Sequence, residues 1–358
     1  MSFYSSVNVI QIEHSSMCNA ACPQCLREWW NGDYSRINQT YLPLEFYQNN
    51  IPKEVYKNLQ KINFCGTVGD PCTAPNFIEV CRYIKTNYPH IELVIATNGG
   101  MRNADWWREL AETLAPNDIV IFGIDGLEDT NYIYRVNVRW TKLMDNVNSY
   151  ISAGGVAWWQ FIVFEHNENQ MEQATALSKE LGFKNFYTIY NNRFLVEEMF
   201  GRTASIGGNG QPLRPPTARD NVSPLLRRDK PTIPSKEEWL ASAEQTCIKC
   251  QAQLTFEAYI DAEGHLLPCC YLAGAKFTLK EDDVDGYYDL WTTYGADKIN
   301  LTYNHWDSII TGDFYQALSA SWTKSFIDGR LLVCSGVCGN KEVQFSMYKN
   351  KSQENTLS

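Results

Sequence analysis

The chain has 358 residues and a formal net charge of −10, with 20% charged and 13% aromatic residues. This length predicts one large α/β unit and a smaller module, and the composition is that of a globular protein. The acidic balance argues against binding to nucleic acid, and no apolar run reaches the roughly 20 residues of a membrane span. Residues 1–8 lack the basic and apolar segments of a secretory signal, so we expect a cytoplasmic protein.

Strands and helices are predicted to alternate along residues 1–195. Apolar segments predict strands at 9–12, 61–64, 92–96, 119–124, 157–164 and 185–189. Helical spacing of apolar residues predicts helices at 76–87, 105–114, 142–152 and 169–181. Such alternation implies parallel strands joined by crossover helices, with ligands bound at the carboxyl ends of the strands.

The composition changes after residue 195. Residues 196–245 are rich in Gly, Pro and Arg and predict a linker or loop. We expect its arginines to face solvent or to bind an acidic partner or substrate: Arg202, Arg214, Arg219, Arg227 and Arg228. Residues 246–345 contain six cysteines and predict a small metal-binding domain, and residues 346–358 form a polar tail.

Three of the twelve cysteines lie close together after the first predicted strand. Cys18, Cys22 and Cys25 fall within eight residues. In a reducing compartment such a group indicates metal binding rather than disulfides. Three thiolates suit a four-iron cluster in which one iron has no protein ligand and can bind a substrate or cofactor. The alternative is a zinc site that takes a distant fourth ligand such as His14.

At this point the sequence resembles a known family. The segment Cys18-Asn19-Ala20-Ala21-Cys22-Pro23-Gln24-Cys25 resembles the CxxxCxxC signature of radical S-adenosylmethionine (radical SAM) enzymes. Further segments resemble motifs of that family in the same order, at the ends of the next predicted strands: Gly66-Thr67-Val68-Gly69-Asp70-Pro71, Thr97-Asn98-Gly99 and Gly123-Ile124-Asp125-Gly126-Leu127. The stretch from Asp129 to Arg135 resembles one that often follows in peptide-modifying members.

The resemblance implies a fold, a cluster and a cofactor. The fold is a partial (β/α)6 barrel of the TIM type, and the cluster is a 4Fe-4S cluster on Cys18, Cys22 and Cys25. S-adenosylmethionine would contact Gly69, Asp70, Thr97, Asn98, Asp125 and Arg135, with the guanidinium of Arg135 pairing with its carboxylate. Two positions depart from the family pattern. Gln24 stands where an aromatic residue often packs on adenine, and Asp70 replaces the family's Glu.

The late cysteines resemble the SPASM/twitch auxiliary cluster domain of the same family. The spacing Cys250-x13-Gly264-x4-Cys269 is followed by Cys334-x3-Cys338. Two all-cysteine cubanes would need about eight thiolates, so six cysteines favour one auxiliary cluster, a 4Fe-4S cluster in the shorter twitch form. We expect Cys250, Cys269, Cys334 and Cys338 as ligands, with Cys247 as the alternate ligand. An all-cysteine structural zinc site is the competing interpretation.

Three other cysteines are candidates for chemistry. Cys65 and Cys72 lie near the predicted cofactor site and are possible hydrogen-atom donors, and Cys270 is a possible redox participant beside Cys269. The plainer interpretation of each is packing in the core.

The expected function follows from the resemblance. A radical SAM enzyme cleaves S-adenosylmethionine reductively, and the resulting 5′-deoxyadenosyl radical abstracts a substrate hydrogen atom. We expect a peptide or small protein as substrate, an auxiliary cluster that transfers electrons or anchors the substrate, and a flavodoxin- or ferredoxin-type electron donor. The alternatives are a twitch-type dehydrogenase of a small alcohol, sugar or amine, and a metal-bearing scaffold without catalysis.

Overall fold

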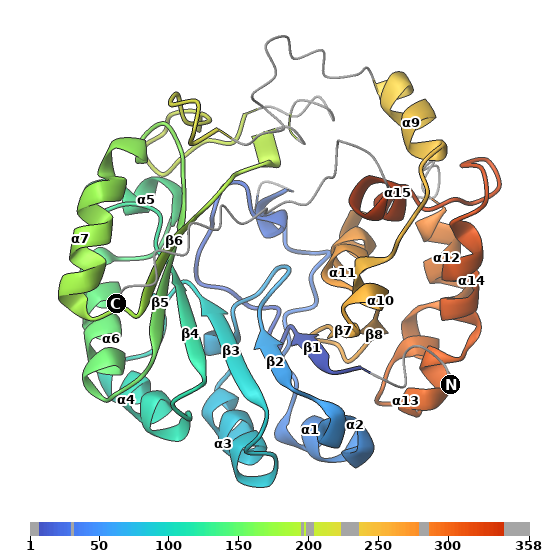
Figure 1. The fold of residues 1–358 in the computed structure, drawn as a ribbon, viewed down its shortest axis with the longest axis horizontal. Helices are drawn as coiled ribbons and strands as arrows, with labels where there is room; N and C mark the ends of the chain where they lie inside the picture. The colour runs from blue at the N-terminus through green and yellow to red at the C-terminus, as the bar shows by residue number, and fades with distance from the viewer. Residues whose placement is uncertain are drawn as a thin grey trace.

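The computed structural model describes residues 7–29, 32–194, 197, 204–222, 236–278 and 286–339. These residues form one mixed α/β fold. Eight strands form a single sheet in the order β6-β5-β4-β3-β2-β1-β7-β8 (Figure 1). Neighbouring strands are parallel except that β8 runs antiparallel to β7. The strands are β1 Val9–Ile12, β2 Lys61–Phe64, β3 Glu92–Thr97, β4 Ile119–Gly123, β5 Ala157–Ile162, β6 Asn185–Ile189, β7 Glu257–Ile260 and β8 Leu266–Leu267.

The six strands predicted for the first part of the chain are all present. Three of them have the predicted bounds, β1, β2 and β6. The predicted strand at 157–164 ends two residues early, at Ile162. The side chain of Asn167 donates to the Ile162 carbonyl at 2.9 Å and accepts from the Phe164 amide at 2.7 Å, which turns the chain away from the sheet.

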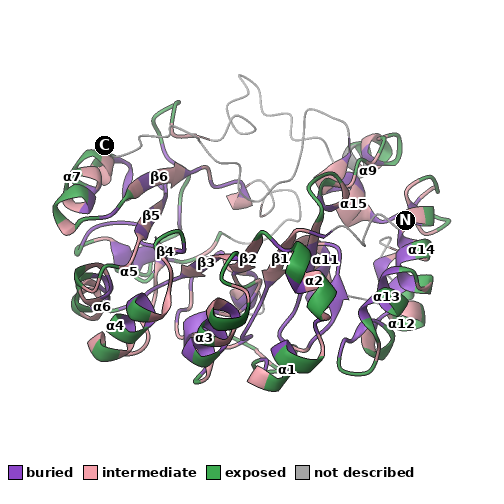
Figure 2. Cartoon of the chain, turned by 60° about the horizontal axis from the view of Figure 1, so that its bottom comes forward, coloured by how far each residue is buried: buried purple, intermediate pink, exposed green. Residues whose placement is uncertain are grey.

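Helices cover the outer side of β1 to β6 (Figure 1). They include the four predicted helices and two that the sequence did not indicate, α1 and α2. A third unpredicted helix, α5, lies in the loop after β4, where Asn131 Oδ1 accepts from the Asp125 amide (2.9 Å). The bounds of these helices are α1 Leu44–Asn49, α2 Lys53–Asn58, α3 Phe77–Asn87, α4 Ala104–Thr113, α5 Asn131–Tyr134, α6 Trp140–Ser152 and α7 Met171–Leu181. In α3 and α4 the buried residues face the sheet and the exposed ones face outward (Figure 2). None of the helices in the described parts of the chain has the length and apolar character that a membrane crossing requires.

Side chains on the two faces of the sheet differ in burial. Ile10 and Ile12 of β1 point toward the helices and are fully buried, whereas Gln11 between them is half-buried on the opposite face. We refer to this opposite face as the inner face. It carries a hydrogen bond from Gln11 to Glu257 (3.2 Å) and an ion pair between Lys61 and Glu92 (3.1 Å). The inner face is therefore polar and partly open.

The cysteine-rich part of the chain extends the same sheet. Strand β7 pairs in parallel with β1, with Ile10 opposite Ala258, and its hairpin partner β8 follows. Tyr259 and Leu267 belong to the same hydrophobic core as Ile10. The remaining helices are α9 Lys236–Glu244, α10 Gln251–Leu254, α11 Cys270–Ala275, α12 Tyr287–Tyr294, α13 Trp306–Ile310, α14 Asp313–Ser321 and α15 Leu332–Cys338.

Residues 204–222, which we name the covering segment, are attached to the first part of the chain. Ser205 donates to the Pro23 carbonyl (3.1 Å), and the Gly208 amide donates to the Ile133 carbonyl (2.8 Å). Of the arginines in the predicted linker, Arg214 forms a long, exposed ion pair with Glu165 (3.8 Å). Arg202, Arg227 and Arg228 lie outside the described residues. The linker predicted at 196–245 thus includes an attached segment and, at its end, helix α9.

Candidate functional site

The three early cysteines lie in the loop that follows β1, at the carboxyl ends of the parallel strands. The Cys25 amide donates to the Cys22 carbonyl (2.8 Å), which closes a turn between the two residues. Three N–H groups point at the sulfurs. Cys18 Sγ accepts from the Ala20 amide (3.4 Å) and from Asn98 Nδ2 (3.7 Å), and Cys22 Sγ accepts from Arg135 Nη1 (3.8 Å). Donors of this kind stabilise metal-bound thiolates, so the donor set fits a cluster held by this loop.

His14 is not available to this loop. Its Nδ1 lies 2.8 Å from the Tyr47 hydroxyl and its Nε2 lies 3.2 Å from Asn76 Oδ1, both on the helix side of the sheet. The rings of Phe64 and Phe77 pack against it. Burial lowers the pKa of His14 to about 3. The zinc alternative that used His14 as fourth ligand is therefore wrong, and His14 is a core residue with both ring nitrogens bonded.

Asp70 joins the ends of β2 and β3. Its carboxylate accepts from the Cys72 amide (3.0 Å), from Thr97 Oγ1 (3.0 Å) and from the amide and side chain of Asn98 (2.8 and 2.7 Å). These bonds bring the predicted residues Asp70, Thr97 and Asn98 together. They also occupy the acceptor capacity of the carboxylate, so a contact from Asp70 to a cofactor amine would have to replace one of them.

Gly69 holds the loop before Asp70 tightly against the cysteine loop. A Cβ atom on Gly69 would lie 1.7 Å from the Ser15 carbonyl oxygen, so no other residue fits there without moving the backbone. The amide of Asp70 donates to the Met17 carbonyl (2.8 Å), next to Cys18. The motif loop and the cysteine loop therefore form one unit.

Asp125 and Arg135 form a buried ion pair at the ends of β4 and β5. Arg135 Nε lies 2.6 Å from Asp125 Oδ2, and the Ile162 amide donates to the other carboxylate oxygen, also at 2.6 Å. Arg135 Nη2 lies over Gly123, where a Cβ atom would approach it to 2.2 Å. Asp125 thus positions the guanidinium, and Arg135 presents it beside Cys22.

Glu13 is a functional candidate that the sequence analysis missed. It is 1% exposed and accepts from the amides of Val68 (2.7 Å) and Gly69 (3.0 Å). Its second oxygen accepts from the hydroxyl of Tyr259 (3.2 Å), which also contacts Thr67 Oγ1 (2.7 Å). Burial raises the pKa of Glu13 to about 7. The sequence does show that Glu13 directly follows the first strand, on the side of the inner face. Its partners lie far away in sequence, so the sequence alone did not mark it as functional.

The candidate thiols divide into two groups. Cys72 is fully buried behind the motif loop. Cys65, which follows β2 on the inner-face side, and Cys270, the first residue of α11, are both half-buried. Burial raises the pKa of Cys65 to about 12 and that of Cys270 well above its ordinary value, so both are neutral thiols. The structure leaves Cys65 and Cys270 as the accessible candidates.

Four late cysteines line one pocket, which is otherwise largely apolar. Cys250 and Cys269 immediately precede α10 and α11, and Cys334 and Cys338 lie one turn apart on α15. The pocket is lined by Ile248, Cys250, Pro268, Cys269, Tyr271, Leu272, Leu318, Trp322, Val333, Cys334, Val337 and Cys338. The alternate ligand, Cys247, is exposed and does not line this pocket. The pocket thus contains the four cysteines that the sequence analysis preferred.

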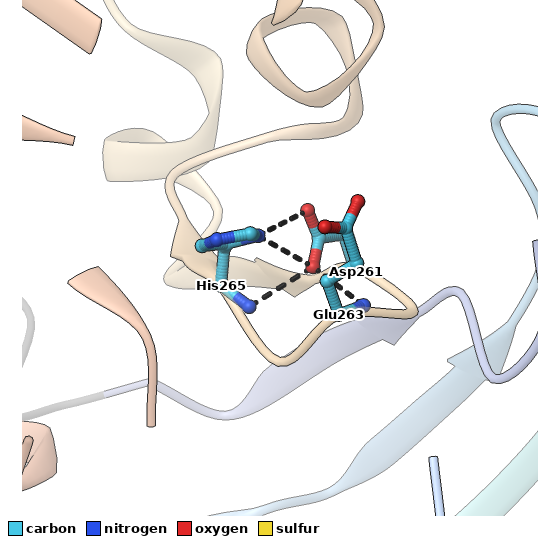
Figure 3. Close-up of side chains that lie close together, drawn as sticks. All are labelled: Asp261, Glu263 and His265. Carbon is cyan, nitrogen blue, oxygen red and sulfur yellow. Dashed lines mark hydrogen bonds and ion pairs between the residues drawn. The ribbon is translucent and has the colours of Figure 1, made fainter. Parts of the chain in front are cut away.

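A different group resembles a metal site but contains its own cation. Asp261, Glu263 and His265 lie in the hairpin between β7 and β8, with their ligand-type atoms within 4.8 Å of one another (Figure 3). Lys276 Nζ lies 2.5 Å from Asp261 and 2.9 Å from Glu263. The ammonium group therefore neutralises the carboxylates, and the group braces the hairpin.

Comparisons with known proteins identify the fold. No family model matches the chain, and neither does any curated protein sequence. The structure is similar to the crystal structure of Streptococcus suis SuiB, with a TM-score of 0.53 and 13% identity over 93% of this chain and 73% of SuiB. SuiB bound to precursor peptide SuiA gives a TM-score of 0.53 at 13% identity, over 93% of this chain and 72% of SuiB. SuiB bound to S-adenosylmethionine gives a TM-score of 0.51 at 12% identity, over 93% of this chain and 71% of SuiB. At such low identity the likeness shows a shared fold.

Proposed function

We propose that this chain is a radical SAM enzyme that modifies a peptide or small protein. The observation that carries the proposal is the three-cysteine loop after β1, where Cys18 and Cys22 receive N–H donors at the carboxyl ends of parallel strands. The similarity of the fold to SuiB, which has been crystallised with S-adenosylmethionine, supports the same conclusion.

The residues of this loop have separate roles in the proposed site. Cys18, Cys22 and Cys25 would hold a 4Fe-4S cluster, and Arg135 would pair with the carboxylate of S-adenosylmethionine. When bound, the cluster and S-adenosylmethionine supply one-electron cleavage of a carbon–sulfur bond and removal of a hydrogen atom from the substrate. Asp125 keeps Arg135 in place, and the network around Asp70 fixes the neighbouring strand ends. Gly69 allows the two loops to approach closely.

The pocket of Cys250, Cys269, Cys334 and Cys338 would hold one auxiliary cluster. The Cys250 and Cys338 thiols share a hydrogen bond, and Cys269 and Cys334 line the same pocket. Four thiolates would satisfy either an iron–sulfur cluster or the competing zinc site, so iron and sulfide analysis separates the two. The cluster would accept an electron from the substrate or anchor it, with a flavodoxin- or ferredoxin-type protein as electron donor.

The inner face supports a peptide as the substrate. Its half-buried side chains include Gln11, Asn63, Gln160 and Tyr187, which are uncharged hydrogen-bonding groups that suit a peptide backbone. The similarity to SuiB bound to precursor peptide SuiA supports the same substrate class.

The test is anaerobic reconstitution followed by measurement of iron, sulfide and 5′-deoxyadenosine. About eight irons per chain are expected, falling to about four when Cys18, Cys22 and Cys25 are all replaced by Ala. Cys250→Ala should also lose about four irons, whereas the exposed Cys247→Ala should lose none. Iron-free protein, or reduced protein that forms no 5′-deoxyadenosine from S-adenosylmethionine, would refute the proposal. Turnover of a small alcohol, sugar or amine but of no peptide would refute the substrate class.

A further inference from the structure

The side-chain NH₂ group of Gln24 is buried and has no hydrogen-bond partner among the described residues. Gln24 lies in the cysteine loop between Cys22 and Cys25 and is 2% exposed. Its Oε1 accepts a hydrogen bond from Asn191 Nδ2 at 2.6 Å, just after β6. Its Nε2 is buried and donates to no acceptor in the part of the chain that the structure describes. Buried polar groups are almost always hydrogen-bonded, so an acceptor is missing at this position.

The hydrogen bonds of Asn191 determine which end of the Gln24 side-chain amide is left unpaired. The backbone amide of Arg193 donates to Asn191 Oδ1 at 2.9 Å, so Asn191 must direct its NH₂ group at Gln24. Gln24 must then direct its oxygen at Asn191, because the opposite orientation would place two donors face to face. The unpaired group is therefore an NH₂ donor, and its ligand must offer an acceptor.

The charges around the cysteine loop separate the two ends of the proposed cofactor. The guanidinium of Arg135, beside Cys22, matches its carboxylate. Gln24 and Asn191 are neutral and nine-tenths buried, which matches a neutral group. Adenine is the neutral end of S-adenosylmethionine and offers ring nitrogens as acceptors, which Gln and Asn amides bind well.

We propose that Gln24 donates from Nε2 to a ring nitrogen of adenine in the bound cofactor, and that Asn191 is a positioning residue that orients Gln24. This inference rests on the proposed function and adds to it the residue that selects the base. Adenine would supply the acceptor that Nε2 lacks. A hypoxanthine base would offer a protonated N1 in place of an acceptor, so Gln24 would discriminate against it if N1 is the contact.

The experiment measures equilibrium binding to the cluster-loaded protein under anaerobic conditions. The probes are S-adenosylmethionine and its 1-deaza, 3-deaza and 7-deaza analogues, each of which replaces one ring nitrogen with C–H. One analogue should bind the wild type about tenfold more weakly, the effect of one lost hydrogen bond. Gln24→Met should bind S-adenosylmethionine about tenfold more weakly and lose the discrimination between analogues.

Further variants separate this contact from a general effect on the loop. Asn191→Leu should lose part of the discrimination, because it frees the orientation of Gln24. Gln316→Met, an exposed glutamine of α14 whose Nε2 donates to the Thr311 carbonyl (2.7 Å), is the control and should keep it. The iron content of each variant checks that it retains its clusters. If Gln24→Met loses its clusters, Gln24→Glu serves as the second variant. It replaces the donor with an acceptor and should also lose the discrimination.

The outcomes distinguish the two levels of the proposal. Wild-type protein that binds S-adenosylmethionine but binds all three deaza analogues equally well would overturn the role of Gln24 alone. Discrimination that survives in the Gln24 variants would also overturn it. Wild-type protein that holds no cluster, or does not bind S-adenosylmethionine at all, would overturn the proposed function and this inference together.

Discussion

The buried carboxyl group of Glu13 makes the stability of this protein depend on pH. Burial raises its pKa from the ordinary 4.5 to about 7, although the amides of Val68 and Gly69 donate to it. The nearby charges of Asp261 and Lys276 act in opposite directions and are smaller causes than burial. The folded protein therefore keeps a proton on Glu13 at pH values where the unfolded chain has lost it.

The sign and size of the effect follow from proton linkage. Below pH 4.5 both states are protonated and there is no penalty. Between pH 4.5 and 7 only the folded state keeps the proton, so stability falls by about 1.4 kcal/mol per pH unit, or about 3 kcal/mol in total. Above pH 7 the loss is complete. For 358 residues, 3 kcal/mol corresponds to a change of about 4 °C in the unfolding midpoint.

Glu13→Gln tests this reasoning because the amide imitates the protonated acid. Its oxygen accepts from the same two amides and its NH₂ group faces the Tyr259 hydroxyl. We expect the variant and the wild type to unfold at similar temperatures at pH 5, and the variant to unfold about 4 °C higher at pH 8. Thermal unfolding of the cluster-loaded protein under anaerobic conditions measures this difference. Glu112→Gln, an exposed carboxylate of α4, is the control. Equal differences at both pH values would refute the raised pKa.

Three further predictions concern other contacts. Gly123→Ala should push the Arg135 guanidinium away, because its Cβ would lie 2.2 Å from Nη2. Equilibrium binding of S-adenosylmethionine should then weaken roughly tenfold, and unchanged affinity would contradict the role of Arg135. Glu168→Gln should loosen the covering segment, since the Glu168 carboxylate accepts from the amides of Thr217 and Ala218 (both 3.0 Å). Amide hydrogen exchange in that segment should become about tenfold faster, and unaltered exchange would argue against this anchor. Lys276→Met should destabilise the hairpin by about 3–5 kcal/mol in thermal unfolding. Stabilisation of the wild type by a divalent metal ion would show a metal site there instead.

Local patterns were sufficient to predict much of the fold. Alternating burial marks β1 and β2, and both have the predicted bounds. In α3 the apolar residues recur at helical spacing, and in α7 the chain ends the helix at Gly182, which has a φ of 89°. These features depend on a few neighbouring residues, so a sequence window contains the whole signal. The short helices α1 and α2 were missed because each has only six residues, too few to show a period.

The candidate site was predicted less completely, because its contacts cross the chain. Cys18, Cys22 and Cys25 could be found by spacing alone. The partner of Glu13 at Tyr259 lies 246 residues away, and that of Gln24 at Asn191 lies 167 residues away. No local pattern indicates such pairs, because they form only when the strand ends meet.

The sequence by itself determined the parallel β/α order and the position of the three-cysteine loop, because strand and helix periods and close cysteine spacing are local properties. Tertiary structure decided that β7 extends the sheet beside β1, that Asp125 serves Arg135, and that Cys250, Cys269, Cys334 and Cys338 share a pocket from which Cys247 is absent. These arrangements depend on which distant strands and helices pack together, and packing is settled by the whole buried core at once.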